Sequence, residues 1–191
     1  MTATLPLLAW PVPLLVGGRK PRITDSFGYS EIRGRVHEGV DIMYPRLPSD
    51  GGKEDVAVLP IYARRSFMPF GVPAIAVANG QVIIVKKIGT GIVINVDHKG
   101  WVSQYFHLRS AAVKDGQYVA KGQALGEIGF DPSGYALNHL HFQIKIEGEI
   151  VDPEPYLRKA QFAVNPWHVG IGIGTVLSLV GMWFLYKKFR S

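Results

Sequence analysis

Residues 113–129 read VKDGQYVAKGQALGEIG, and this stretch indicates the fold class most directly. Asp115-Gly116 and Lys121-Gly122 are turn-forming pairs between short runs of residues that suit strands. Glycine is frequent in such turns because it adopts positive φ values without steric strain. The stretch therefore predicts two tight turns that connect short antiparallel strands.

The same pattern extends through residues 23–157. Residues 74–85, AIAVANGQVIIV, place Asn79-Gly80 between two apolar runs, which predicts a β-hairpin. A further turn is expected at Lys99-Gly100, again between two strand-like runs. No convincing amphipathic period of an α-helix occurs in this region. We therefore expect a mainly β domain, built as an antiparallel, glycine-rich sheet or β-sandwich.

A long apolar run near the C-terminus predicts a different kind of element. Residues 167–186 are 20 residues with no formal charge except the titratable His168, and the basic tail 187–191 follows. A helix of this length rises about 30 Å, the hydrocarbon thickness of a bilayer. We expect one transmembrane helix in a lipid bilayer, with the C-terminus inside and the bulk of the chain outside. A buried core helix is the alternative.

Three further segments complete the expected organisation. Residues 1–22 begin with an apolar run that contains three prolines, Pro6, Pro11 and Pro13, and follows no basic residue, which favours an extended segment over an export signal. Residues 46–72 are rich in proline, glycine and mixed charge, and form an insertion loop in the β-domain. Residues 158–166 form a short linker that keeps the domain close to the membrane.

Composition excludes several classes of function. At 191 residues the chain holds one ordinary domain and one appendage. It has no cysteine, which excludes disulfides and thiolate metal sites. The net charge is +6, and three of the basic residues lie in the C-terminal tail. The remaining positive charge is too small to suggest a nucleic-acid partner.

Histidines in two short motifs suggest a metal site. In NHLHFQI, residues 138–144, His139 and His141 are two residues apart and would lie on the same face of a strand. In VHEGVDI, residues 36–42, His37 and Asp41 flank a turn that enters a strand. A catalytic zinc takes three protein ligands and a water, so His37, Asp41 and one histidine of the pair would suffice. Taken alone, the histidine pair is more often a surface or core feature than a metal site, whereas an exposed His37 with a turn-capping Asp41 is about as frequent as a metal role.

His107 ends the apolar run QYFHL, where a hydrogen-bonded core histidine is the default interpretation. The combination of motifs changes the interpretation. In chain order they are ITDSFGY, HEGVDIMYP, ANGQV, VINVDH, YFHL, VKDGQYVAKGQALGEIG, NHLHFQI and EIVDPEPYL. With these motifs the chain resembles the lysostaphin and LytM type of zinc endopeptidase over residues 23–157.

The resemblance implies a function and a role for each site residue. His37, Asp41 and His141 would bind Zn²⁺, and His107 and His139 would be catalytic. The substrate would be the peptide part of bacterial peptidoglycan, either its cross-links or its stem peptides. Inactive members of this family typically lack some of these residues, so their retention favours an enzyme.

Two positions depart from the family pattern. Asn138 stands where proline is usual, and Gln143 stands where glutamate is frequent. The first changes one wall of the substrate groove. The second alters a contact behind the metal ligands and leaves the ligands themselves unchanged.

Other functions remain open at this stage. A non-catalytic member of the same fold could bind the wall or activate another hydrolase. A structural protein of a membrane-containing phage particle could lie in the internal membrane of the virion, with virion or membrane proteins as partners. A lipoyl or biotinyl carrier, suggested by residues 113–129, is excluded because the modifiable lysine between methionines is absent.

Overall fold

The computed structural model describes residues 5–30, 34–47, 65–89, 91–129 and 138–163. Within these ranges the prediction of a mainly β, antiparallel domain is confirmed. The described helices are the short 3-10 helix η1 (Val16–Gly18) and the α-helix α2 (Glu154–Leu157). The strands are β1 (Arg22–Asp25), β2 (Gly28–Ser30), β3 (Arg35–His37), β4 (Val40–Pro45), β5 (Ser66–Phe67), β6 (Pro73–Ile75), β7 (Gly80–Ile88), β8 (Gly91–Asp97), β9 (Trp101–Ala111), β10 (Tyr118–Val119), β11 (Ala124–Ile128), β12 (Leu140–Ile146) and β13 (Glu149–Val151).

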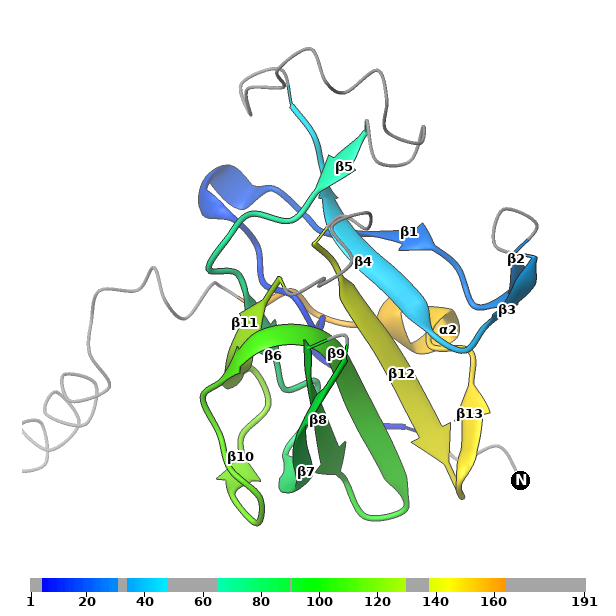
Figure 1. Ribbon diagram of the computed structural model, residues 1–191, viewed down its shortest axis with the longest axis vertical. Coiled ribbons are helices and arrows are strands. Elements are labelled where there is room, and N and C mark those ends of the chain that lie inside the picture. Colours follow the sequence, from blue (N-terminus) through cyan, green and yellow to red (C-terminus); the bar gives the residue numbers. More distant parts are fainter. Residues whose placement is uncertain (1–4, 31–33, 48–64, 90, 130–137, 164–191) are drawn as a thin grey trace, which may run out of the picture.

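One large sheet organises the domain. Its strand order is β1-β4-β12-β9-β8-β7-β10, with β11, β13, β5 and β6 paired beside this path. Figure 1 shows β4, β12 and β9 crossing the molecule side by side, with β8, β7 and β10 below. The hairpin of β2 and β3 forms a separate two-stranded sheet beside β4. Segments far apart in the sequence are therefore adjacent at β4 and β12.

The turn between β8 and β9 follows the sequence prediction. Lys99 and Gly100 have φ values of 62° and 102°, and the His98 amide donates to the Trp101 carbonyl at 2.9 Å. Two successive positive φ values are typical of the two-residue turns that match the twist of a hairpin. The expected turn at Lys99-Gly100 is confirmed.

The two turns expected in residues 113–129 are also confirmed. Gly116 and Gly122 have φ values of 79° and 87°. In the second turn, the Gln123 amide donates to the Ala120 carbonyl at 3.0 Å. The first turn leads into β10, which pairs with β7, and the second turn separates β10 from β11.

The prediction of a hairpin around Asn79-Gly80 is wrong. β6 pairs with β11, whereas β7 pairs with β8 and β10, so the two apolar runs do not pair with each other. Gly80 has another role: a Cβ atom at this position would lie 2.5 Å from the Asp97 carbonyl oxygen. The glycine permits close approach of two backbones, which a local sequence pattern cannot distinguish from a turn.

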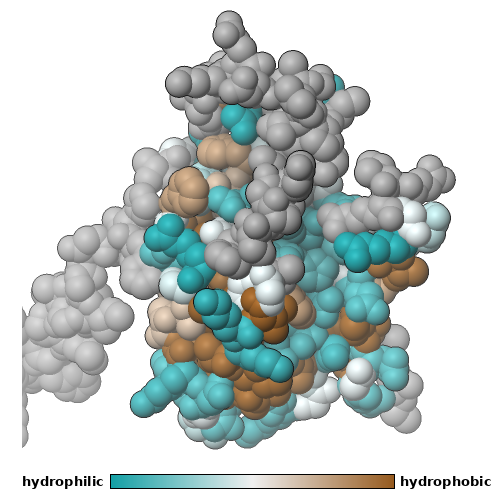
Figure 2. All heavy atoms as spheres, viewed as in Figure 1, coloured by the Kyte–Doolittle hydropathy of each residue, from teal (hydrophilic) through white to brown (hydrophobic). Residues whose placement is uncertain are grey.

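The core lies against one face of the large sheet. Tyr105 and Phe142 are direct partners in β9 and β12, both are fully buried, and their ring centroids are 5.3 Å apart. Truncating a buried phenylalanine to alanine costs about 3–5 kcal/mol. Because side chains alternate along a strand, His141 and Gln143 face away from this core. Figure 2 shows hydrophilic atoms over β4 and β12, and apolar atoms gathered over the strands below.

The segment before β1 packs along the domain. Leu8, Trp10 and Val12 are buried, and the Trp10 ring stacks on Phe162 at 5.1 Å. The Ala9 amide donates to the Val77 carbonyl at 2.7 Å. Backbone hydrogen bonds and apolar contacts thus hold this segment in place.

Two predicted segments lie wholly or partly beyond the described ranges. Residues 48–64 of the expected 46–72 insertion are outside them; on its far side β5 pairs with β4, with Phe67 opposite Tyr44. The expected membrane span 167–186 and tail 187–191 also lie outside them. In the part of the chain that is described, no helix has the length and apolar character needed to cross a bilayer.

Candidate metal centre

The first half of the candidate site is the turn from β3 into β4. His37 ends β3, and Asp41 is the second residue of β4. The chain bends at Gly39 between them, and His37 Nε2 lies 3.1 Å from Asp41 Oδ1. His37 is 5% and Asp41 is 3% exposed. A buried carboxylate beside a buried imidazole requires a partner for its charge.

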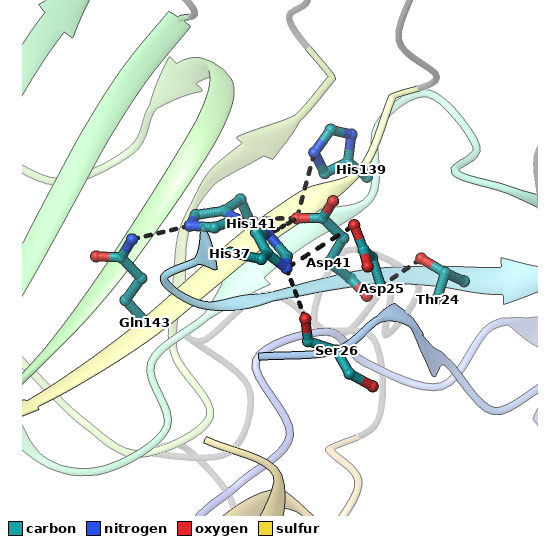
Figure 3. A network of polar contacts seen from close by, with 8 residues as sticks. All are labelled: Thr24, Asp25, Ser26, His37, Asp41, His139, His141 and Gln143. Carbon is teal, nitrogen blue, oxygen red and sulfur yellow. Dashed lines mark hydrogen bonds and ion pairs between the residues drawn. The ribbon is translucent and has the colours of Figure 1, made fainter. Parts of the chain in front are cut away.

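The second half of the site is the start of β12. His141 is the direct cross-strand partner of Asp41, with its Nδ1 atom 2.9 Å from Asp41 Oδ1. The same Nδ1 atom lies 2.9 Å from His37 Nε2. Figure 3 shows the three side chains directed at one point between β4 and β12. The three expected metal-binding side chains are therefore adjacent.

The donor set fits a zinc ion. Tetrahedral zinc with ligand bonds of about 2.0–2.2 Å separates neighbouring ligand atoms by roughly 3.3–3.6 Å. The observed separations of 2.9 to 3.1 Å need to open by only a few tenths of an ångström. His37 Nδ1 lies 2.9 Å from the Ser26 carbonyl oxygen and so donates its proton there, which leaves the Nε2 lone pair for a metal. Two imidazoles and a carboxylate are a common set of catalytic zinc ligands.

The electrostatics of the site also favour a cation. Burial alone would raise the pKa of Asp41, but hydrogen bonds from His141 and His37 hold this pKa far below its usual range. Burial opposes protonation of His37, yet the hydrogen bond and charge of Asp41 leave the pKa of His37 raised. The carboxylate is thus ionised at neutral pH, and a metal ion must displace a proton from His37 in acid.

His107 and His139 lie beside the three candidate ligands. Their ring centroids are 4.7 Å apart, and His107 is 6.0 Å from the His141 ring. His139 Nε2 lies 3.5 Å from Asp41 Oδ1. The structure therefore brings all five residues that the sequence singled out into one place. β12 begins at Leu140, so His139 lies just before the strand that was expected to include it.

The backbone at His107 is unusual. His107 has a φ value of 63°, and the pairing of β9 with β11 shifts register at this point, between Leu108 and Ser110. The pairing of β9 with β8 shifts register close by. Bulges re-aim side chains, and a left-handed non-glycine residue stores backbone strain that often accompanies function. No local residue pattern indicates this bulge.

Gly39 packs closely against the candidate site and was not among the site residues predicted from the sequence. A Cβ atom at position 39 would lie 2.5 Å from the Phe142 carbonyl oxygen and 2.8 Å from His141 Nε2. The turn that carries His37 and Asp41 therefore packs directly against β12 only because residue 39 lacks a side chain. Its position within HEGVD, between two candidate ligands, is the signal that could have identified it.

Comparisons with known proteins agree with this geometry. Peptidase family M23 matches residues 64–153, which include His107, His139 and His141 but begin after His37 and Asp41. Lipoprotein NlpD of Yersinia enterocolitica is 32% identical over 90 residues, which are 46% of this chain and 91% of that protein. The chain belongs to peptidase family M23. The expected resemblance to this family is confirmed.

Other similar proteins include both an activator and a peptidase. Murein hydrolase activator EnvC of Escherichia coli K12 is 37% identical over 84 residues, 43% of this chain and 20% of EnvC. A zinc-containing peptidase from Vibrio cholerae has a similar structure, with a TM-score of 0.54, 25% identity, and coverage of 80% of this chain and 40% of that one. This chain thus spans less than half the length of either protein.

Proposed function

We propose that this M23 chain is a zinc-dependent endopeptidase that hydrolyses the peptide part of bacterial peptidoglycan. The observation that carries the proposal is the triangle of His37 Nε2, Asp41 Oδ1 and His141 Nδ1, with sides of 2.9 to 3.1 Å. The zinc-containing peptidase from Vibrio cholerae, which has a similar structure, supports the choice of metal.

Three side chains would hold the zinc ion, and two would act on protons. When bound, zinc acidifies a water and polarises a carbonyl group. His107 and His139 lie together at the edge of the site, where they can orient that water and accept its proton. One of the two can then return a proton to the leaving amine. Asp41 Oδ1 lies 3.5 Å from His139 Nε2, so this imidazole adjoins the candidate ligands directly.

Zinc content and turnover together test the proposal. The purified full-length protein should contain one zinc per chain and release new amino termini from purified peptidoglycan. Chelation should stop the release, and added zinc should restore it. Walls with direct cross-links and walls with glycine bridges, digested in parallel, identify the bond. A folded protein that binds no zinc, or binds it without hydrolysis, would contradict the proposal.

A second candidate is an activator of another hydrolase. The similarity to EnvC, named a murein hydrolase activator, favours it. The two functions differ in one measurement, since an activator alone releases nothing and increases the rate of a separate wall amidase. Retention of all five site residues supports the enzyme.

We also propose that residues 167–186 anchor the enzyme in a bilayer, with the catalytic domain facing the wall. The support is the uncharged 20-residue run before the basic tail. The full chain should stay with membranes after alkaline carbonate extraction, whereas a chain ending at residue 166 should not. Recovery of the full chain in the soluble fraction would contradict the anchor. If the protein comes from a phage, we expect to detect it in purified virions.

A further inference from the structure

A row of three buried amide side chains crosses the sheet next to the candidate metal site. Gln143 in β12 is the direct partner of Gln104 in β9, and Gln104 is the direct partner of Asn95 in β8. Gln143 and Gln104 are 7% exposed, and Asn95 is 8% exposed. Directly opposed residues share a face of the sheet with Cβ atoms about 4.5–5.5 Å apart. The three amides therefore adjoin one another.

Two oxygens in this row lack a donor. Gln104 Oε1 and Asn95 Oδ1 are buried and accept no hydrogen bond from the described residues. Leaving a buried polar atom without a partner is costly, so native proteins nearly always satisfy it. These oxygens lie on neighbouring strands, which suggests one cause for both.

The row ends at a metal-binding histidine. Gln143 Nε2 lies 2.9 Å from His141 Nε2, and Figure 3 shows the amide oxygen directed away from the ring. A neutral imidazole carries one proton. If His141 Nδ1 offers its lone pair to zinc, the proton is on Nε2, and it would face the donor group of Gln143. An amide keeps its outline when its nitrogen and oxygen exchange places, so the same position can present Oε1 instead.

We propose that Gln143, Gln104 and Asn95 form one directional chain of hydrogen bonds that holds His141 in its metal-binding tautomer. His141 Nε2–H donates to Gln143 Oε1, Gln143 Nε2–H donates to Gln104 Oε1, and Gln104 Nε2–H donates to Asn95 Oδ1. This arrangement gives a donor to both oxygens that lack one. The inference rests on the proposed zinc function, because only a metal on Nδ1 requires the proton on Nε2.

This chain of hydrogen bonds explains why residue 143 is glutamine in this protein. A glutamate would accept from His141 equally well, but it would have no proton to donate to Gln104. Glutamine accepts at one end and donates at the other, so it can connect His141 to the row. Gln143 and Gln104 are therefore positioning residues, which act on the metal through His141.

The zinc affinity of the full-length protein, measured by competition with a chelator, tests the proposed chain of hydrogen bonds. Gln143→Leu should weaken zinc binding by roughly 10- to 100-fold. Gln104→Met should weaken it in the same direction, although Gln104 lies one strand away from the ligand. Gln143→Glu should restore most of the affinity, because it keeps the acceptor for His141. The matched control is Gln81→Met, because the Gln81 side-chain amide donates a hydrogen bond to the Gly116 carbonyl oxygen elsewhere on the sheet.

A spectroscopic measurement on the unsubstituted protein gives a second readout. In the zinc-loaded, ¹⁵N-labelled chain, the His141 Nε2 proton and the side-chain amide protons of Gln143 should exchange slowly with solvent. Gln104→Met should speed the exchange of the Gln143 amide. Normal zinc binding combined with fast exchange of both groups in the unsubstituted chain would overturn the hydrogen-bond chain alone. A folded protein without zinc affinity would overturn the proposed function as well.

Discussion

His141 Nδ1 lies 2.9 Å from Asp41 Oδ1, although 100 positions separate the two residues in the chain. They meet because β4 and β12 are neighbours in the sheet and pair these two residues directly. His37 joins them from the adjoining turn. The candidate metal site is therefore a product of strand pairing, and its parts can be tested one by one.

Asp41→Asn should abolish zinc binding and hydrolysis together. The substitution keeps the shape of the side chain but removes the negative charge that a catalytic zinc site of this kind uses. Metal analysis after dialysis and a peptidoglycan digestion assay measure the two effects. Asp97→Asn is the matched control, because Asp97 Oδ1 accepts a hydrogen bond from the Lys99 amide in a turn, at 3.1 Å. Stoichiometric zinc in Asp41→Asn would contradict the ligand assignment.

His107→Asn should keep zinc and lose turnover. Asparagine tolerates the positive φ value of 63° at this position, so the change removes the imidazole with little added backbone strain. Loss of a general acid or base typically lowers the rate by about 10²- to 10⁴-fold. Lys99→Asn, at a φ value of 62° in the β8–β9 turn, is a control for the backbone. Unchanged hydrolysis by His107→Asn would show that His107 is not catalytic.

Gly39→Ala should destabilise the protein and weaken zinc binding. The added methyl group would lie 2.5 Å from the Phe142 carbonyl oxygen and 2.8 Å from His141 Nε2, so β12 or the turn must move. Overpacking of this kind costs about 1–3 kcal/mol of stability. Gly89→Ala is the control, since no atom of the described residues lies within 4 Å of a Cβ atom there. Thermal unfolding and zinc titration measure both variants; equal behaviour would show that the close approach is unimportant.

His98 should make stability depend on pH near neutrality. Burial lowers the pKa of His98, whose Nδ1–H donates to the Asn79 carbonyl oxygen at 2.8 Å and whose Nε2 lies 2.7 Å from Ser103 Oγ. The unfolded chain then binds a proton more readily than the folded chain. The stability that neutral His98 contributes is present above its unfolded pKa of about 6.5 and is lost as pH falls below that value.

The comparison with His98→Gln isolates this contribution. Urea unfolding at pH 5.5 and pH 7.5, in the presence of a chelator, should show a larger loss of stability in acid for the unsubstituted protein than for the variant. The raised pKa of His37 gives the opposite slope, but it is common to both proteins and cancels in the difference. Parallel pH profiles would refute the role of His98.

Local patterns in the sequence predicted what local chemistry determines. The turns at Lys99-Gly100 and Gly122 follow from glycine and its tolerance of positive φ values. The histidine and aspartate motifs indicated the candidate ligands, and the family resemblance joined them into one site. Each of these signals lies within a few consecutive residues.

Features that depend on distant strands could not be predicted. Asn79-Gly80 matches the sequence of a hairpin turn, but Gly80 instead allows the Asp97 backbone to lie close to its own. The bulge at His107 arises where β9 meets both β8 and β11. Gln143 faces Gln104 only because of the β9–β12 register. A single sequence contains no direct record of such pairings.

Because Asp41 and His141 are direct partners in the sheet, the candidate metal site forms only when β4 and β12 pair in this register. Successive residues of a strand point to opposite faces, so a slip of β12 by one position would turn its histidine into the apolar interior. A misaligned chain would then be unable to capture the ion. Zinc binding would thus require the correct register of β4 and β12, and only correctly aligned molecules would be active under the proposed function.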